Sequence, residues 1–216
     1  MGELDNYFLS EKANKVERFR HLNQYAKKGQ ILFTGSSLME QFPINEILLN
    51  NGMNLTIYNR GIGGYVIPEM LNAMEEQIFG LMPSKIFINI GTNDISNPKE
   101  TKEMLMSDYR KVLTQIKERL PQTVVYLMAY YPVCEKVAAK QDWDALTPVR
   151  LRMERLEEAN KAVEELAREF GYNYIDVNEG LTDESGQTKE EFSIDGIHMW
   201  SDAYEIVFNN MKKYLI

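Results

Sequence analysis

The sequence predicts an α/β fold in which a parallel sheet carries helices on both faces. Short runs rich in isoleucine, valine, phenylalanine and tyrosine alternate with longer amphipathic segments along the 216 residues. Most of the short runs are almost continuously apolar, which is typical of strands buried on both faces. Strands that alternate with helices form βαβ units, and these place a parallel sheet between two helical layers. No linker or repeat interrupts the alternation, so we expect a single domain over residues 1–216.

Five of the short apolar runs are the expected strands of this sheet. In chain order they are Ile31–Thr34, Leu55–Asn59, Lys85–Ile90, Thr123–Tyr130 and Tyr172–Val177. The segments between them carry apolar residues at every third or fourth position, which is the spacing of one buried helix face. We therefore interpret these stripes as core faces and not as binding sites.

Residues with strong terminal preferences indicate where the helices begin and end. Residues 97–100 place asparagine, proline and glutamate at the N-cap, N1 and N3 positions of one helix. The Thr-Pro pair at 147–148 is expected to open the next helix, and Gly171 to end it. Gly29 is expected to end the helix that precedes the first strand.

The charge limits the partners that the chain can bind, and the cysteine content limits its disulfides. The chain has 32 acidic and 24 basic residues, a net charge of −8, and no run of lysine or arginine. Phosphate binding needs a surplus of basic side chains on some face, so we expect no nucleic-acid partner. The single cysteine, Cys134, excludes an internal disulfide, and we expect it to be a small, partly buried residue without a catalytic role.

The sequence contains no pattern typical of secretion or membrane insertion. The first 20 residues include early acidic residues and no apolar stretch of signal-peptide length. No run of about 18 apolar residues occurs, so we expect no integral membrane segment and a cytoplasmic location. The apolar stripes suit an interface as well as a core, so they predict no particular oligomeric state.

Polar and glycine-rich segments follow the predicted strands. Gly35–Leu38 follows the first strand, Asn59–Gly64 the second and Gly91–Asp94 the third, whereas Asp195–His198 follows the fifth after a long loop. In open parallel sheets the ligand crevice lies beyond the carboxyl ends of the strands. We therefore expect these four segments to converge on one edge of the sheet.

These segments contain the groups that acyl transfer requires. The reaction needs a hydroxyl nucleophile, a base within hydrogen-bond reach, a carboxylate that orients the base, and donors for the developing oxyanion. Ser37, His198 and Asp195 suit the first three roles. The backbone N–H groups of Ser37 and Gly64 and the side-chain amide of Asn93 suit the fourth.

The four segments resemble the sequence blocks of the SGNH hydrolases, a branch of the GDSL-like esterases and lipases. Gly-Ser-Ser-Leu at 35–38 is similar to the Gly-Asp-Ser-Leu block, Gly91–Asp94 matches Gly-x-Asn-Asp, and Asp195–His198 matches Asp-x-x-His. The second segment, with Gly-Ile-Gly-Gly at 61–64, looks closest to the platelet-activating-factor acetylhydrolase-like branch. All four blocks occur in family order between residues 35 and 198.

The resemblance implies a flavodoxin-like, three-layer α/β/α sandwich with five parallel strands. It implies a serine hydrolase that uses no metal or cofactor, with Ser37 as nucleophile, Asp195 and His198 as triad partners, and Gly64 and Asn93 in the oxyanion hole. Family members cleave carboxylic esters, including acetylated sugars and lipid esters, so the implied partner is a small-molecule ester. We see no apolar insertion large enough for a lipase lid, which favours a short acyl group.

Four residues near these blocks have roles that the family pattern does not define. Ser36 replaces the aspartate of the first block, so two serines are adjacent, and the family nucleophile falls on Ser37. Tyr65 stands where many relatives carry aspartate, which is expected to alter the pocket wall and the substrate class. Trp143 and Trp200 suit either a pocket wall or a structural anchor.

Other functions fit the same residues less well. Asp94, Asp195 and His198 include only one histidine and make a poor transition-metal site. We expect Asp94 to hold its loop instead. The glycines at 61–64 lack the G-x-G-x-x-G spacing, which disfavours a nucleotide site. Two alternatives stay open: a transacylase, in which an alcohol other than water accepts the acyl group, and a non-catalytic binding module on the same fold.

Overall fold

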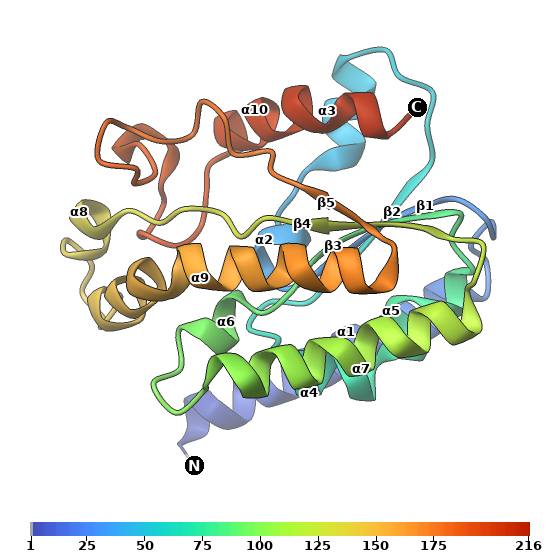
Figure 1. Cartoon of the computed structure of the whole chain (residues 1–216), viewed down its shortest axis with the longest axis horizontal. Coiled ribbons are helices and arrows are strands. Elements are labelled where there is room, and N and C mark those ends of the chain that lie inside the picture. Colours follow the sequence, from blue (N-terminus) through green and yellow to red (C-terminus); the bar gives the residue numbers. More distant parts are fainter. Residues whose placement is uncertain (1) are drawn as a thin grey trace.

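Five parallel strands form one sheet at the centre of the computed structural model, which describes residues 2–216 (Figure 1). The strands are β1 (Ile31–Gly35), β2 (Ile57–Gly61), β3 (Lys85–Asn89), β4 (Val124–Met128) and β5 (Asn173–Ile175). Each strand overlaps one of the predicted runs, and their order in the sheet is β2-β1-β3-β4-β5. The direction of winding therefore reverses at β1, between its neighbours β2 and β3.

The register aligns the carboxyl ends of three neighbouring strands. Gly35 at the end of β1 pairs with Gly61 of β2 on one side and with Asn89 of β3 on the other. The segments that follow these strands therefore leave the sheet at the same edge, next to the reversal of winding. Such an edge is where ligands bind in open parallel sheets.

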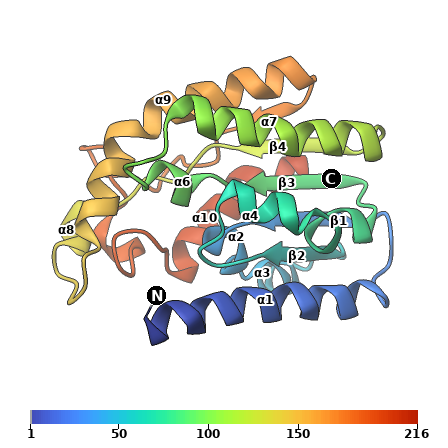
Figure 2. The same cartoon turned by 90° about the horizontal axis from the view of Figure 1, so that it is seen from below.

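Helices cover both faces of the sheet, which confirms the predicted three-layer α/β/α fold (Figures 1 and 2). The helices are α1 (Glu3–Asn23), α2 (Ser37–Glu40), α3 (Ile44–Asn50), α4 (Ile67–Asn72), α5 (Met74–Gln77), α6 (Thr92–Ile95), α7 (Lys102–Arg119), α8 (Glu135–Ala138), α9 (Leu146–Phe170) and α10 (Ser201–Met211). Helices α3 and α10 lie on one face, and α4, α5, α7 and α9 lie on the other. No helix within residues 2–216 combines the length and the hydrophobicity needed to cross a bilayer.

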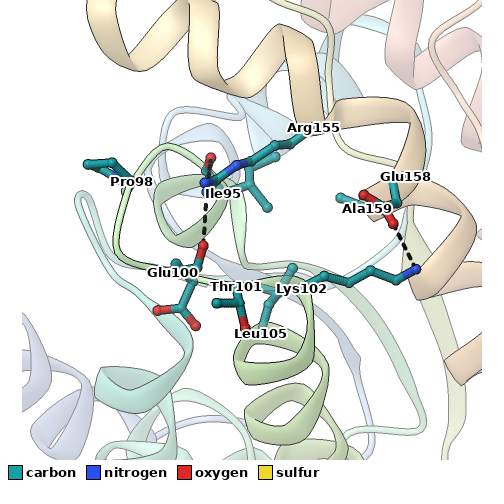
Figure 3. A pocket seen from close by; sticks show the side chains of 9 residues that line it. All are labelled: Ile95, Pro98, Glu100, Thr101, Lys102, Leu105, Arg155, Glu158 and Ala159. Atoms are coloured by element: carbon teal, nitrogen blue, oxygen red, sulfur yellow. Dashed lines mark hydrogen bonds and ion pairs between the residues drawn. The ribbon is translucent and has the colours of Figure 1, made fainter.

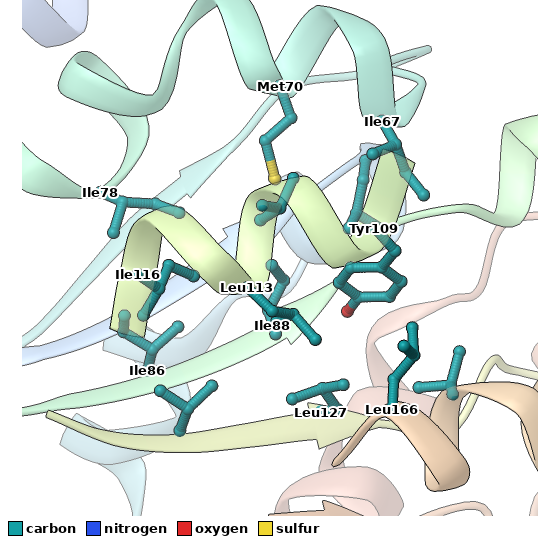
Figure 4. Close-up of a cluster of buried hydrophobic side chains, with 14 of the residues drawn as sticks. Ile67, Met70, Ile78, Ile86, Ile88, Tyr109, Leu113, Ile116, Leu127 and Leu166 are labelled. Carbon is teal, nitrogen blue, oxygen red and sulfur yellow. The ribbon is translucent and has the colours of Figure 1, made fainter. Parts of the chain in front are cut away.

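The sheet separates two apolar clusters, because successive side chains of a strand point to opposite faces. In β3, Ile86 and Ile88 join the cluster that packs against α4, α7 and α9, whereas Phe87 joins the cluster under α3 and α10. Figure 4 shows the first cluster, in which Leu113 of α7 lies among side chains from the sheet and Met70 of α4. Strands β1 and β3 are thus buried on both faces, as their composition predicts, whereas β2, β4 and β5 keep partly exposed positions.

Two predicted helix ends are wrong, and for the second a local hydrogen bond explains the difference. Helix α1 ends at Asn23, and Gly29 lies beyond it in a turn. Helix α7 begins after Thr101, whose hydroxyl accepts a hydrogen bond from the backbone N–H of Met104 (3.2 Å). Asn97 instead accepts a backbone N–H two residues on, within the loop before the helix.

The ends of α9 lie close to their predicted positions. The helix starts at Leu146, one residue before the Thr-Pro pair, and ends at Gly171, which adopts the left-handed conformation (φ 71°). The segment between β4 and α9 contains the short helix α8.

Candidate active site

The carboxyl edge of the sheet brings together the three residues of the predicted triad. Ser37 follows β1 and is the first residue of α2, whereas Asp195 and His198 lie in the turn before α10. His198 Nε2 lies 2.9 Å from Ser37 Oγ, and His198 Nδ1 lies 2.7 Å from Asp195 Oδ2. An ionised carboxylate only accepts hydrogen bonds, so Nδ1 carries the proton and Nε2 is free to accept from the serine hydroxyl.

The Asp195 carboxylate is held in its ionised form by its own turn. Its Oδ1 atom accepts the backbone N–H groups of Ile197 (2.9 Å) and His198 (2.8 Å). Burial opposes ionisation, but the hydrogen bonds from the side chain and backbone of His198 outweigh it and lower the pKa of Asp195 to about 2. At neutral pH this group is therefore an anion that orients the imidazole and stabilises an imidazolium.

A glycine at the end of β1 allows the chain to deliver Ser37 to this position. Gly35 has a φ of +150°, and a Cβ there would lie 2.0 Å from the carbonyl oxygen of Asn89. The two adjacent serines then enter different surroundings. Ser36 is fully buried, with its hydroxyl 3.4 Å from that of Thr92, whereas Ser37 lines a cleft.

Ser37, Gly64 and Asn93 line the same cleft, and each has a hydrogen-bond donor. The side-chain amide of Asn93 donates one N–H to the carbonyl of Tyr65 (2.8 Å), which leaves its second N–H for a ligand. The backbone N–H groups of Ser37 and Gly64 have no acceptor within residues 2–216. The neighbouring N–H of Gly63, in contrast, already donates to a glutamate carboxylate (2.6 Å). All five predicted site residues therefore lie close to one another or line one cleft.

The cleft has a volume of about 460 Å³, and helix α1 forms one of its walls. This helix contributes Phe8, Glu11, Lys12 and Lys15. Sequence reasoning missed this wall, although the four positions share one helix face. Three of the four are charged, so no apolar stripe marks them.

The three aromatic residues with undefined roles do not line this cleft. Tyr65 is buried in the apolar cluster with α4 and α7, so its ring does not form the pocket wall, and only its carbonyl contacts Asn93. Trp143 and Trp200 are 49% and 53% exposed. The expectation that Tyr65 alters the pocket wall is therefore wrong.

Two buried charged residues lie behind the cleft. Asp94 Oδ1 accepts the backbone N–H of Ile67 (3.0 Å), which ties α6 to the start of α4. Arg152 of α9 is fully buried, and its Nε donates to Ser96 Oγ (3.0 Å). Burial lowers the pKa of Arg152 to about 10, although the negative charge of Asp195 opposes this. Sequence reasoning missed Arg152, because it lies among exposed charged residues of α9.

A separate cavity of about 240 Å³ lies between α9 and the segment that joins α6 to α7 (Figure 3). Arg155 donates there to the backbone carbonyls of Asn97 (2.9 Å) and Glu100 (3.1 Å), and Lys102 pairs with Glu158 (3.0 Å). These contacts fix the loop that follows α6. We assign this cavity a structural role.

Comparison with protein families identifies the family of the chain. The model of the GDSL-like Lipase/Acylhydrolase family matches residues 44–206, which is most of the chain. The matched range begins after Ser37 and includes Gly64, Asn93, Asp195 and His198.

Solved structures with the same fold include esterases. A protein from Streptococcus pneumonia, whose name refers to platelet activating factor, is 30% identical, with a TM-score of 0.87 over 99% of this chain and 96% of that chain. An acetylxylan esterase from Geobacillus stearothermophilus is 13% identical, with a TM-score of 0.64 over 88% of this chain and 95% of that chain. At this identity the second likeness shows the fold alone.

A curated relative is much longer than this chain. The N-acylneuraminate cytidylyltransferase of Escherichia coli is 22% identical over 92% of this chain, but the match spans only 42% of that protein. The family match shows that the chain belongs to the GDSL-like lipase/acylhydrolase family.

Proposed function

We propose that the chain is a serine esterase that cleaves short-chain carboxylic esters, with Ser37 as nucleophile, His198 as general base and Asp195 as the orienting carboxylate. The observation that carries the proposal is the unbroken hydrogen-bond chain from Ser37 Oγ through His198 to Asp195. A nucleophile, a base and an orienting acid at these distances are the requirements of covalent acyl transfer.

The reaction proceeds in two halves. Ser37 Oγ bonds to the ester carbonyl carbon while His198 Nε2 takes its proton, and the carbonyl oxygen becomes an oxyanion held by the N–H groups of Ser37, Gly64 and Asn93. The bond to the leaving alcohol then breaks, and His198 returns the proton to that alcohol. Water then attacks the acyl-enzyme while His198 takes its proton. The bond from the acyl carbon to Ser37 Oγ breaks, His198 returns the proton to Ser37, and the carboxylic acid leaves.

The size of the cleft and one structural relative support a short acyl group. A volume of about 460 Å³ lies within the range of small-molecule sites. The acetylxylan esterase that shares the fold acts, by its name, on an acetylated substrate. We therefore infer acetyl esters as the first substrates to test, with longer acyl chains hydrolysed more slowly.

The proposal is tested by covalent labelling with a fluorophosphonate, followed by peptide mass spectrometry. We expect one adduct on Ser37, which Ser37→Ala abolishes together with hydrolysis of p-nitrophenyl acetate. Ser36→Ala is the matched control, because Ser36 is buried beside the nucleophile and is expected to leave the adduct on Ser37. A folded wild-type chain without an adduct, or a Ser37→Ala variant that still hydrolyses the ester, contradicts the proposal.

A further inference from the structure

Helix α1 contacts the loop of residues 63–66 through a lysine that has three acceptors. Lys12 Nζ donates to the carbonyl of Gly64 (2.8 Å) and to both carboxylate oxygens of Glu69 (2.9 Å each). Glu69 also accepts the backbone N–H of Val66 (3.0 Å). The ammonium therefore connects α1 to both the carbonyl of the loop and the first residues of α4.

A second lysine repeats this arrangement at the start of the loop. Lys15, which lies three residues further along α1, forms an ion pair with one carboxylate oxygen of Glu40. The other carboxylate oxygen of Glu40 accepts the N–H of Gly63 (2.6 Å). The loop is thus held at both ends by carboxylates, and each of these carboxylates is held by a lysine of α1.

The orientation of this loop sets the direction of two oxyanion donors. Gly64 has a left-handed φ of +71°, and glycine rotates easily about its backbone, so the contact of its carbonyl with Lys12 restrains the Gly64–Tyr65 peptide, which directly follows the donor N–H of Gly64. The next carbonyl, that of Tyr65, accepts the amide of Asn93 and so orients the second donor. Lys12 Nζ also lies 5.5 Å from the centroid of the Tyr65 ring.

We propose that Lys12 is a positioning residue of the oxyanion hole. It holds residues 63–66 so that the donors of Gly64 and Asn93 point at the same substrate oxygen. This inference rests on the proposed serine-esterase function. The three acceptors of Lys12 use all the donors of an ammonium group, so Lys12 acts through the loop and not by binding the substrate. Oxyanion donors act in the transition state, so a loss of alignment lowers kcat more than it changes KM.

The first test is Lys12→Met, which keeps much of the side-chain length and removes the charge and the donors. With p-nitrophenyl acetate we expect kcat to fall about 10- to 100-fold, because displacements of about 1 Å cost rates of this order, while KM changes less than about threefold. The matched control is Arg20→Met, because Arg20 of α1 pairs with Glu76 of α5 (2.8 Å) outside the cleft. We expect this control to keep wild-type kcat and to lose similar thermal stability.

The second test is a double-mutant comparison that separates positioning from a general structural role. If Lys12 aligns the donors of Gly64 and Asn93 together, Lys12→Met lowers kcat by a clearly smaller factor on an Asn93→Ala background than in the wild type. Lys12→Met with wild-type kcat, or effects that multiply fully in the double variant, overturns the role of Lys12. A wild-type chain that neither hydrolyses esters nor labels at Ser37 overturns the proposed function instead.

Discussion

At the scale of single residues, the Asp94 carboxyl lies in surroundings that oppose its charge. Asp94 follows Asn93 in α6 and is almost fully buried, and its Oδ2 atom has no hydrogen-bond partner within residues 2–216. Burial raises the pKa of Asp94 to about 6 from an ordinary 3.8, although the N–H of Ile67 lowers it. Between these two values the folded protein keeps a proton that the unfolded chain has lost.

This difference predicts how Asp94→Asn changes the pH dependence of stability. Because the folded wild type binds more protons, its free energy of unfolding decreases as pH rises from about 4 to 6, and the loss persists above pH 6. The variant lacks this titration, so relative to wild type we expect it to gain up to about 3 kcal/mol between pH 4 and pH 7. Denaturant unfolding at pH 4, 5, 6 and 7 measures the gap, and a gap that is constant with pH contradicts the assignment.

At the scale of elements, the junction of β1 with α2 depends on the close approach of two backbones. The N–H of Ser36 donates to the carbonyl of Asn89 (3.3 Å), the same oxygen that a Cβ on Gly35 would approach to 2.0 Å. The junction therefore determines both the pairing of β1 with β3 and the place of the nucleophile. Any side chain at 35 has to separate the two strand ends.

We therefore expect Gly35→Ala to be strongly destabilising, by about 3 kcal/mol or more, since the methyl group meets backbone atoms that cannot move aside. Gly29→Ala is the matched control, because Gly29 also has a positive φ (76°) but no atom within 4 Å of an added Cβ. That change is expected to cost about 1 kcal/mol from backbone strain alone. Thermal unfolding of the two variants checks the comparison, and equal shifts in Tm count against it.

At the scale of the whole molecule, the sheet couples the two apolar clusters. Every side chain of β3 from Ile86 to Ile88 is fully buried, and successive side chains enter different clusters. Loss of packing on one face therefore disturbs the strand that supports the other. For this reason we expect residues 2–216 to unfold as one cooperative unit.

The test compares Phe87→Ala and Ile88→Ala, which remove neighbouring side chains from opposite faces of β3. We expect the first to lower the free energy of unfolding by about 3–5 kcal/mol and the second by about 2–5 kcal/mol. Each is expected to keep a single transition with coincident far-UV and near-UV circular dichroism. A second transition in either variant indicates that the two layers unfold separately.

The sequence by itself determined the α/β class, the five strands and the Asp195–His198 turn. Strands buried on both faces leave apolar runs, and an aspartate three residues before a histidine meets it through contacts within one turn. Helix ends were less predictable, because several residues near a helix start are suitable caps. Asn97 has the right side chain for a cap, but Thr101 has the position that bonds to the backbone of α7.

Only the tertiary structure decided how distant segments meet. Ser37 and His198 are 161 residues apart, and their contact depends on the sheet order and on the packing of α10. Helix α1 forms a wall of the cleft and holds the loop of residues 63–66, yet its charged face resembles a solvated surface in the sequence. The physical reason is that periodicity and capping report on neighbours along the chain, whereas the cleft is formed by packing between segments that the sequence separates.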